Sequence, residues 1–190
     1  MNDTFKTIFS RTSVRRFTTG EVSKETLVLL AKCGMAAPSA NNRQPWFIIA
    51  VTDRKILEYL GDHLPYAKMS KEAAAALVVC GNLENDPTGN ATSYWVQDCS
   101  AVTENILLAV ESLGLGAVWT ATYPYEERME PVRKILNMPD HLIPLNVIPI
   151  GHPHTKPIPK EKWDTTKFRF NAFATVVTPH PNPSPEGEGL

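Results

Sequence analysis

The feature that most constrains the fold is a long apolar helix pattern in the middle of the chain. Between about Tyr94 and Leu113, apolar residues recur at helical spacing, and others widen the stripe: Val102, Ile106, Ala109 and Val110, with Ala101, Leu107 and Leu108 beside them. Gly114 and Gly116 follow and can end the helix. A helix that is apolar on more than one side must be covered by other elements, so we expect it to be central.

Shorter helix and strand patterns alternate around this helix. Ser23 and Asp53 are predicted N-caps of two helices. The predicted strands are short apolar runs, namely Phe47–Val51, Leu77–Gly81 and Leu145–Gly151, with an extended run over Ala117–Thr122. This alternation predicts an α/β or α+β domain in which helices cover a central sheet.

Two prolines give sharper expectations about position. Pro131 suits the first turn of a helix that holds Val132, Ile135 and Leu136, because a first-turn residue needs no N–H partner. Pro149 cannot donate to a strand ladder, so we expect it at a sheet edge or a strand end.

Composition excludes several classes of protein. The chain has 190 residues, enough for one domain with a sizeable core, and a net charge of −1, which does not suggest a nucleic-acid or membrane surface. We find no signal peptide and no apolar run that could span a bilayer. Cys33, Cys80 and Cys99 are odd in number and far apart, so we predict buried free thiols rather than disulfides, and a cytoplasmic location.

The end of the chain differs in character from the rest. Residues 151–177 contain several prolines and exposed-looking aromatic residues, and we predict an extended arm that packs on another surface. Residues 178–190 are rich in Pro, Gly and Glu and are predicted to be a disordered tail. The domain is therefore expected to cover residues 1–177.

A basic cluster near the N-terminus is the strongest candidate for a binding site. It reads Arg11-Thr12-Ser13-Val14-Arg15-Arg16-Phe17 and joins a short apolar helix pattern to a turn at Thr18–Gly20. Guanidinium and hydroxyl donors together suit a phosphate dianion, and backbone N–H groups are free where elements begin and end. The alternative interpretation is a solvated basic patch.

Other catalytic signatures are missing. There is no G-x-S-x-G, no P-loop and no G-x-G-x-x-G in a strand-to-helix turn. His152 and His154 lack a third ligand nearby, so we predict neither a metal site nor a catalytic side chain. An amide-rich loop between prolines, an aromatic run at Trp119 and a basic segment at Lys167–Arg169 remain, and they suit a cofactor that brings its own reactivity.

These stretches resemble the signatures of the FMN-dependent nitroreductase family, and in particular its small-subunit branch. The resemblance rests on Arg11–Phe17, Pro38–Trp46, Tyr94–Asp98, Gly114–Trp119 and Asp164–Asn171, in order and at matching spacing. It implies an α+β fold with a central mixed, mainly antiparallel sheet flanked by helices. It also implies a homodimer in which the C-terminal arm wraps the partner subunit and FMN is bound at the interface.

The resemblance also implies roles for individual residues. Arg11, Ser13 and Arg15 would hold the phosphate and the ribityl end of FMN, and Lys167 or Arg169 would join them. Thr12 lies in the same cluster, at a position where an arginine is more frequent in the family. Pro38, Ser39 and Ala40 would come from the partner and cover the isoalloxazine ring, and Asn42 would be a polar contact. Trp119, Thr120 and Ala121 would present backbone N–H groups near N5 and O4 of the ring. Members of the family often carry glycine at the position of Ala121. The side chain of alanine would narrow the approach of the backbone to the flavin ring.

The function implied is a ping-pong oxidoreductase in which NADH or NADPH reduces FMN, and an electron-poor nitroaromatic or quinone then takes two electrons. A reductive dehalogenase or flavin-destroying enzyme on the same scaffold is a second hypothesis, with residues 84–93 as a lid over the substrate. A third is a flavin-binding or interaction module without turnover.

Overall fold

The computed structural model describes residues 1–84 and 91–173, in two compact units, residues 1–159 and residues from 160 onward. The predicted tail 178–190 lies outside the described residues. The first unit contains α1 (Asp3–Ser10), β1 (Phe17–Thr18), α2 (Lys24–Met35), η1 (Ala40–Asn42), β2 (Trp46–Val51), α3 (Arg54–His63), η2 (Lys68–Lys71), β3 (Ala75–Asn82), α4 (Ala91–Ser112), β4 (Gly116–Ala117), β5 (Thr120–Ala121), α5 (Glu126–Leu136) and β6 (Leu142–Pro153). The second unit contains η3 (Thr165–Lys167).

The strands form one sheet in the order β1-β6-β3-β2, and β4 and β5 also pair with β6. Each of these pairings is antiparallel, and a parallel bridge joins Ser13 to Ala117. The predicted mixed, mainly antiparallel sheet is therefore confirmed.

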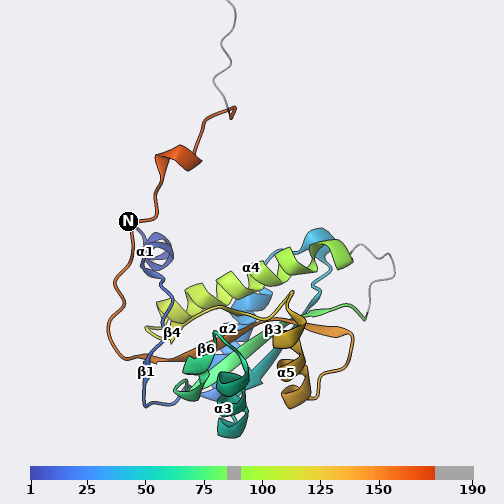
Figure 1. The fold of residues 1–190 in the computed structure, drawn as a ribbon. Coiled ribbons are helices and arrows are strands. Elements are labelled where there is room, and N and C mark those ends of the chain that lie inside the picture. The colour runs from blue at the N-terminus through green and yellow to red at the C-terminus, as the bar shows by residue number, and fades with distance from the viewer. Residues whose placement is uncertain (85–90, 174–190) are drawn as a thin grey trace, which may run out of the picture. The chain divides into compact units, whose positions relative to one another are not determined.

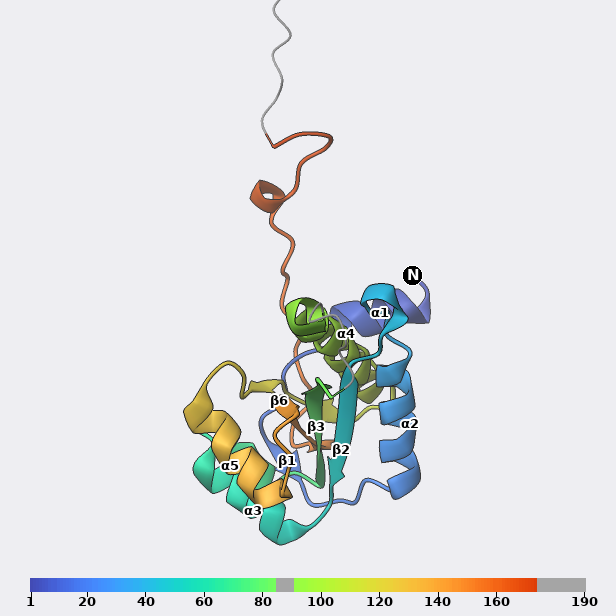
Figure 2. The same cartoon turned by 90° about the vertical axis from the view of Figure 1, so that its right-hand side faces the viewer.

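Helices cover both faces of the sheet (Figures 1 and 2). On one face, Leu77 and Val79 of β3 pack into a core shared with α2 and α4. On the other face, Val78 and Cys80 pack into a core shared with α3 and α5. Alternate residues of a strand point to opposite faces, so β3 is apolar throughout because both of its faces are buried.

The local signals for helix starts are confirmed. Ser23 Oγ accepts a hydrogen bond from Thr26 N at 3.1 Å, and Asp53 Oδ1 accepts one from Lys55 N at 2.8 Å. The long apolar pattern becomes α4, in which Val102 and Ile106 are fully buried, as expected for a central helix. None of the described helices is both long and apolar enough to cross a lipid bilayer.

Two proline expectations and one strand expectation are wrong. Pro131 lies inside α5, which begins at Glu126 because an acidic first turn and the buried Met129 extend it toward the N-terminus. Pro149 lies in β6, the central strand, rather than at an edge. It sits between the residues that pair with β4 and those that pair with β5, because the run Ala117–Thr122 forms two short strands instead of one.

Candidate functional site

The basic segment that follows α1 lies beside the residues that follow α4. Val14 N donates to the carbonyl of Ala117 at 2.9 Å, next to the bridge between Ser13 and Ala117. Gly116 permits this approach, since a Cβ there would lie 2.7 Å from Val14 Cγ1. Two stretches that are far apart in sequence, the arginine cluster and the run at Trp119, are thereby brought together.

A cavity of about 530 Å³ opens at this junction, and we call it the Trp119 cavity. Its lining residues are Arg15, Pro65, Tyr66, Lys68, Met69, Val118, Trp119, Thr120 and Ala121. Two cations and two aromatic rings line it, and none of these residues is acidic. Such a lining favours an anionic ligand with a flat aromatic part.

The three other residues of the predicted phosphate cluster lie next to Arg15 in sequence but do not line this cavity. Arg11 is mostly buried, and its Nε lies 3.3 Å from Glu104 Oε1 on α4. The hydroxyl of Thr12 is buried without a hydrogen-bond partner in the described structure, while Ser13 is exposed. A buried hydroxyl without a partner costs free energy unless a ligand or water completes it, so Thr12 fits a site that a ligand fills.

The three predicted ring-contact residues, Trp119, Thr120 and Ala121, all line the cavity. The hydroxyl of Thr120 donates to Val147 O at 2.6 Å, so this side chain faces β6. Ala121 is exposed and is paired with Asn146 in the sheet. Thr120 and Ala121 can therefore offer a ligand mainly backbone, as the resemblance implies.

The amide-rich loop lies elsewhere on the chain, against the N-terminal half of α4. Ala40 N donates to Asp98 Oδ1 at 3.1 Å. Pro38, Ser39, Ala40 and Asn42 are not among the residues that line the Trp119 cavity of the same chain. Within one subunit the structure thus brings together Arg15 and Trp119–Ala121, but not this loop.

Comparisons with known proteins agree on one family. The nitroreductase family model matches residues 8–79 and 62–152. A relative from Methanothermobacter thermautotrophicus is 41% identical over 173 residues, which are 90% of this chain and 88% of the relative. The chain belongs to the nitroreductase family.

Solved structures of this nitroreductase family share the fold. A crystal structure from Parabacteroides distasonis has a TM-score of 0.85 and 49% identity over 90% of this chain and 99% of that chain. The Parabacteroides distasonis protein and the Methanothermobacter relative bear the same name, "Putative NADH dehydrogenase/NAD(P)H nitroreductase". A Clostridium difficile protein named as an FMN-dependent nitroreductase has a TM-score of 0.80 and 25% identity over 89% of this chain and 99% of that chain. The family membership makes this chain an oxidoreductase enzyme.

The two basic residues predicted to join the phosphate site, Lys167 and Arg169, lie in the second unit of the chain. Lys167 Nζ lies 3.3 Å from Asp164 Oδ2, and Arg169 Nη1 donates to the carbonyls of Thr165 and Phe168 at 2.9 and 2.7 Å. The pKa of Asp164 is lowered, chiefly by the hydrogen bond from the Thr166 side chain. Both cations are therefore engaged locally within their own unit.

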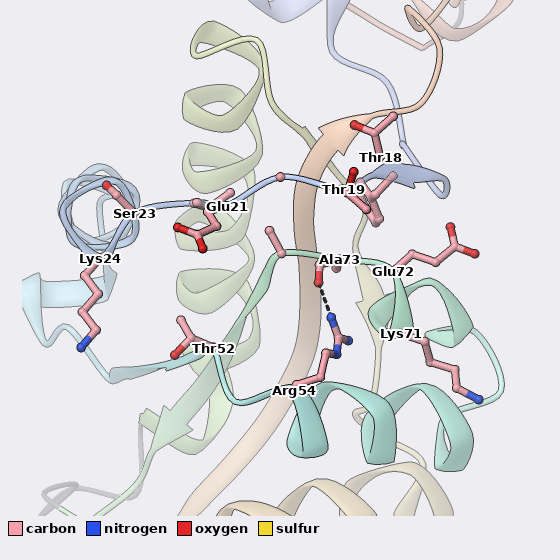
Figure 3. A pocket seen from close by; sticks show the side chains of 14 residues that line it. Thr18, Thr19, Glu21, Ser23, Lys24, Thr52, Arg54, Lys71, Glu72 and Ala73 are labelled. Carbon is pink, nitrogen blue, oxygen red and sulfur yellow. Dashed lines mark hydrogen bonds between the residues drawn. The ribbon is translucent and has the colours of Figure 1, made fainter.

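A larger hollow of about 760 Å³ lies beside the N-termini of α2 and α3 (Figure 3). Two of the cations that line it are already engaged: Arg54 donates to the carbonyls of Ala73 and Ser70 at 2.9 and 2.8 Å, and Lys71 pairs with Asp62. Glu21 and Glu72 add negative charge to the lining. This hollow suits an anionic cofactor less well than the smaller Trp119 cavity.

The thiols are poor candidates for nucleophiles. Burial raises the pKa of both Cys80 and Cys99 to about 12, so neither forms a thiolate near neutral pH. Cys33 is partly exposed, and all three thiols are free. Within the described ranges no three His, Cys, Asp or Glu side chains cluster as metal ligands would.

Sequence reasoning missed several residues around the cavity. Lys68 and Tyr66 lie in a stretch whose composition indicates only a turn, and the packing of α3 against η2 carries them to Trp119. Arg128 stacks over Tyr66, with its Cζ 5.1 Å from the ring centroid, and over Tyr125 at 3.8 Å. Met69 packs against the cluster of Val14 and Phe17 and also lines the cavity. No local motif signals these positions.

Residues 85–90, which make up most of the predicted lid at residues 84–93, lie outside the described residues.

Proposed function

We propose that this protein is an FMN-dependent oxidoreductase that takes electrons from NADH or NADPH and passes them to nitroaromatic, quinone or similar acceptors. The observation that carries the proposal is the Trp119 cavity, where Arg15, Lys68 and the Trp119–Ala121 backbone meet and none of the lining residues is acidic. The name of the Clostridium difficile relative adds support for FMN, and the names of the two other relatives add support for a nicotinamide donor.

The donor set near the cavity fits a flavin phosphate. Arg15 supplies a guanidinium in the cavity, and Arg11, Thr12 and Ser13 supply a second guanidinium and two hydroxyls on the same short segment. Lys167 or Arg169 would add one more cation. Each charge-assisted hydrogen bond contributes about 1.5–3 kcal/mol, so several are needed to hold a phosphate taken out of water.

The apolar part of the lining suits the flavin ring. Pro65, Met69, Val118 and Trp119 exclude water, and the backbone of Trp119–Ala121 would meet the polar edge of the ring. When bound, FMN would supply the redox chemistry, accepting a hydride from the nicotinamide and passing two electrons to the acceptor. The chain needs no acid or base of its own; it orients the reactants and keeps water out.

The proposal includes a homodimer. Helix α1 buries none of its residues, and Phe5, Ile8 and Phe9 are 52%, 44% and 62% exposed. An amphipathic helix with an uncovered apolar face favours cover by a second copy. In that dimer Pro38, Ser39, Ala40 and Asn42 of one subunit would reach the flavin of the other. Residues 151–153 of the predicted 151–177 arm belong to β6, so only the part that follows β6 would wrap the partner. We place this dimer in the cytoplasm, where nicotinamides are available and free thiols remain reduced.

Anaerobic titration tests the proposal. Purified protein incubated with FMN is expected to turn yellow, to lose that absorbance when NADH or NADPH is added, and to regain it with a nitroaromatic or a quinone. Protein that stays colourless would refute the proposal. Bound FMN that neither nicotinamide bleaches would favour a flavin-binding module without turnover, and faster turnover of halotyrosine than of nitrofuran would favour the dehalogenase.

A further inference from the structure

The loop that follows α2 has an unusual backbone. Asn41, Asn42 and Gln44 have φ angles of 52°, 53° and 53°, so three of its residues adopt the left-handed conformation without being glycine. Asparagine tolerates this conformation better than most residues, and glutamine has no such advantage. Backbone of this kind persists only where its surroundings hold it, and it concentrates at sites that bind ligands. We call residues 39–44 the left-handed loop.

Hydrogen bonds within the loop fix its shape. Ser39 accepts twice, through its carbonyl from Asn42 N and through its Oγ from Gln44 N, both at 3.0 Å. Gln44 Nε2 donates to Asn42 Oδ1 at 2.9 Å. These bonds close the loop on itself, but they do not set where it lies on the protein.

Asp98 links the loop to α4. Its side chain lies on α4, is 8% exposed, and accepts the hydrogen bond of Ala40 N at 3.1 Å. A carboxylate is costly to bury unless hydrogen-bond donors compensate it. The Ala40 N–H is such a donor, so the buried Asp98 side chain and the loop stabilise each other. The next residue, Cys99, is fully buried in the core, so the carboxylate projects from a rigid part of the helix.

We propose that Asp98 is a positioning residue that holds the left-handed loop, through the Ala40 N–H, in the conformation that covers the flavin. This inference rests on the proposed function, in which Pro38, Ser39 and Ala40 of one subunit cover the ring bound by the other. Within its own chain the loop is tied to α4 by the bond from Ala40 N to Asp98 Oδ1. A loop shaped in this way before it meets the flavin of the other subunit pays less ordering cost on binding.

Two substitutions separate positioning from plain stability. D98A removes the acceptor, whereas D98N keeps an oxygen at the same place. S100A is the matched control, because Ser100 lies on the same helix and its hydroxyl bonds within the helix, to Val96 O. For each variant we would measure the FMN dissociation constant by fluorescence quenching, the melting temperature without FMN, and hydrogen exchange over residues 38–44. If D98A does not fold, D98S, whose hydroxyl is too short to reach the amide, takes its place.

We expect D98A to raise the FMN dissociation constant about tenfold or more, as loss of a hydrogen bond to a charged group does. D98N is expected to stay within about threefold of wild type and S100A to match it. Exchange at the loop should quicken in D98A alone. Unchanged FMN affinity in D98A, or an equal loss in S100A, would overturn the inference. Failure of the proposed function looks different, since wild type itself would then bind no FMN.

Discussion

The Nε atom of Arg11 lies 3.3 Å from Oε1 of Glu104, a residue of the long helix α4. Arg11 is the first arginine of the predicted phosphate cluster, and its side chain is only 19% exposed, whereas that of Glu104 is 49% exposed. The pair fixes the guanidinium through Nε, which leaves the two Nη groups for a phosphate. It also places a negative charge beside the proposed anion site.

E104Q should therefore tighten FMN binding. The amide keeps an oxygen that accepts from Arg11 Nε, so the substitution removes charge but not the orientation of the guanidinium. Because the carboxylate is half-exposed and screened, we expect a two- to fivefold gain, about 0.4–1 kcal/mol. Titrations of FMN into the apo-protein at low and high salt would measure it, and the gain should shrink at high salt. Weaker binding in E104Q would mean that the charge of Glu104 is needed to hold Arg11.

R15A should weaken FMN binding much more than R16A does. Both arginines are exposed, but only Arg15 lines the Trp119 cavity. Arg16 contributes its backbone carbonyl to a bond from His154 N at 3.0 Å. Loss of the Arg15 guanidinium removes charge-assisted bonds of about 1.5–3 kcal/mol, or roughly 10- to 150-fold in the dissociation constant. The neighbouring residue is thus a control with the same charge. Equal losses in both variants would indicate a diffuse electrostatic effect rather than a specific contact.

The parts of the fold that could be predicted are those that local chemistry decides. Ser23 and Asp53 cap helices because a short side-chain oxygen reaches the free N–H groups of the next turn, and that signal lies within a few residues. The position of Pro149 could not be predicted the same way. The missing N–H is visible in the sequence, but the break between β4 and β5 beside it depends on how distant segments pair.

The candidate site likewise contains residues that local sequence motifs identify and residues that only the packing of distant segments brings there. Arg15 and Trp119 were identified by motif, and the structure brings both to one cavity. Lys68 reaches that cavity because α3 and η2 pack together, and Glu104 reaches Arg11 across the fold. Neither contact has a local signature. The meeting of Pro38–Asn42 with a flavin stays a prediction, since it depends on a second subunit.

The buried thiols predict how stability responds to alkaline pH. Burial raises the pKa of Cys80 and Cys99 from 9.0 to about 12. The unfolded chain therefore loses these protons first, so their stabilising contribution is complete below pH 9 and is lost as pH rises toward 12. Each thiol should lower the free energy of unfolding by up to about 1.4 kcal/mol per pH unit in that window.

Chemical denaturation at pH 8, 9 and 10 would measure this effect. Tyrosine and lysine residues titrate in the same range, so the informative quantity is the difference between wild type and a C80A/C99A variant. The slope should be shallower in the variant. Reaction with a thiol reagent at pH 8 gives a second check, because Cys33 should react in the native protein and the other two only after unfolding. Rapid labelling of all three in the native state would contradict the burial argument.

Gly81 marks a position where the core has no room for a side chain. A Cβ there would lie 2.4 Å from Cε3 of Trp95, which is 3% exposed and packs edge-on against Tyr123 with ring centroids 4.8 Å apart. Since the indole is buried and packed against Tyr123, G81A should destabilise the protein by about 1–3 kcal/mol, as overpacked cores do. Urea unfolding followed by tryptophan fluorescence would give the value. The G81A/W95L double variant should lose less unfolding free energy than the G81A and W95L single variants lose in sum, because the smaller leucine leaves space for the new methyl group. Strict additivity would place the cost of G81A in the backbone instead of in the contact with Trp95.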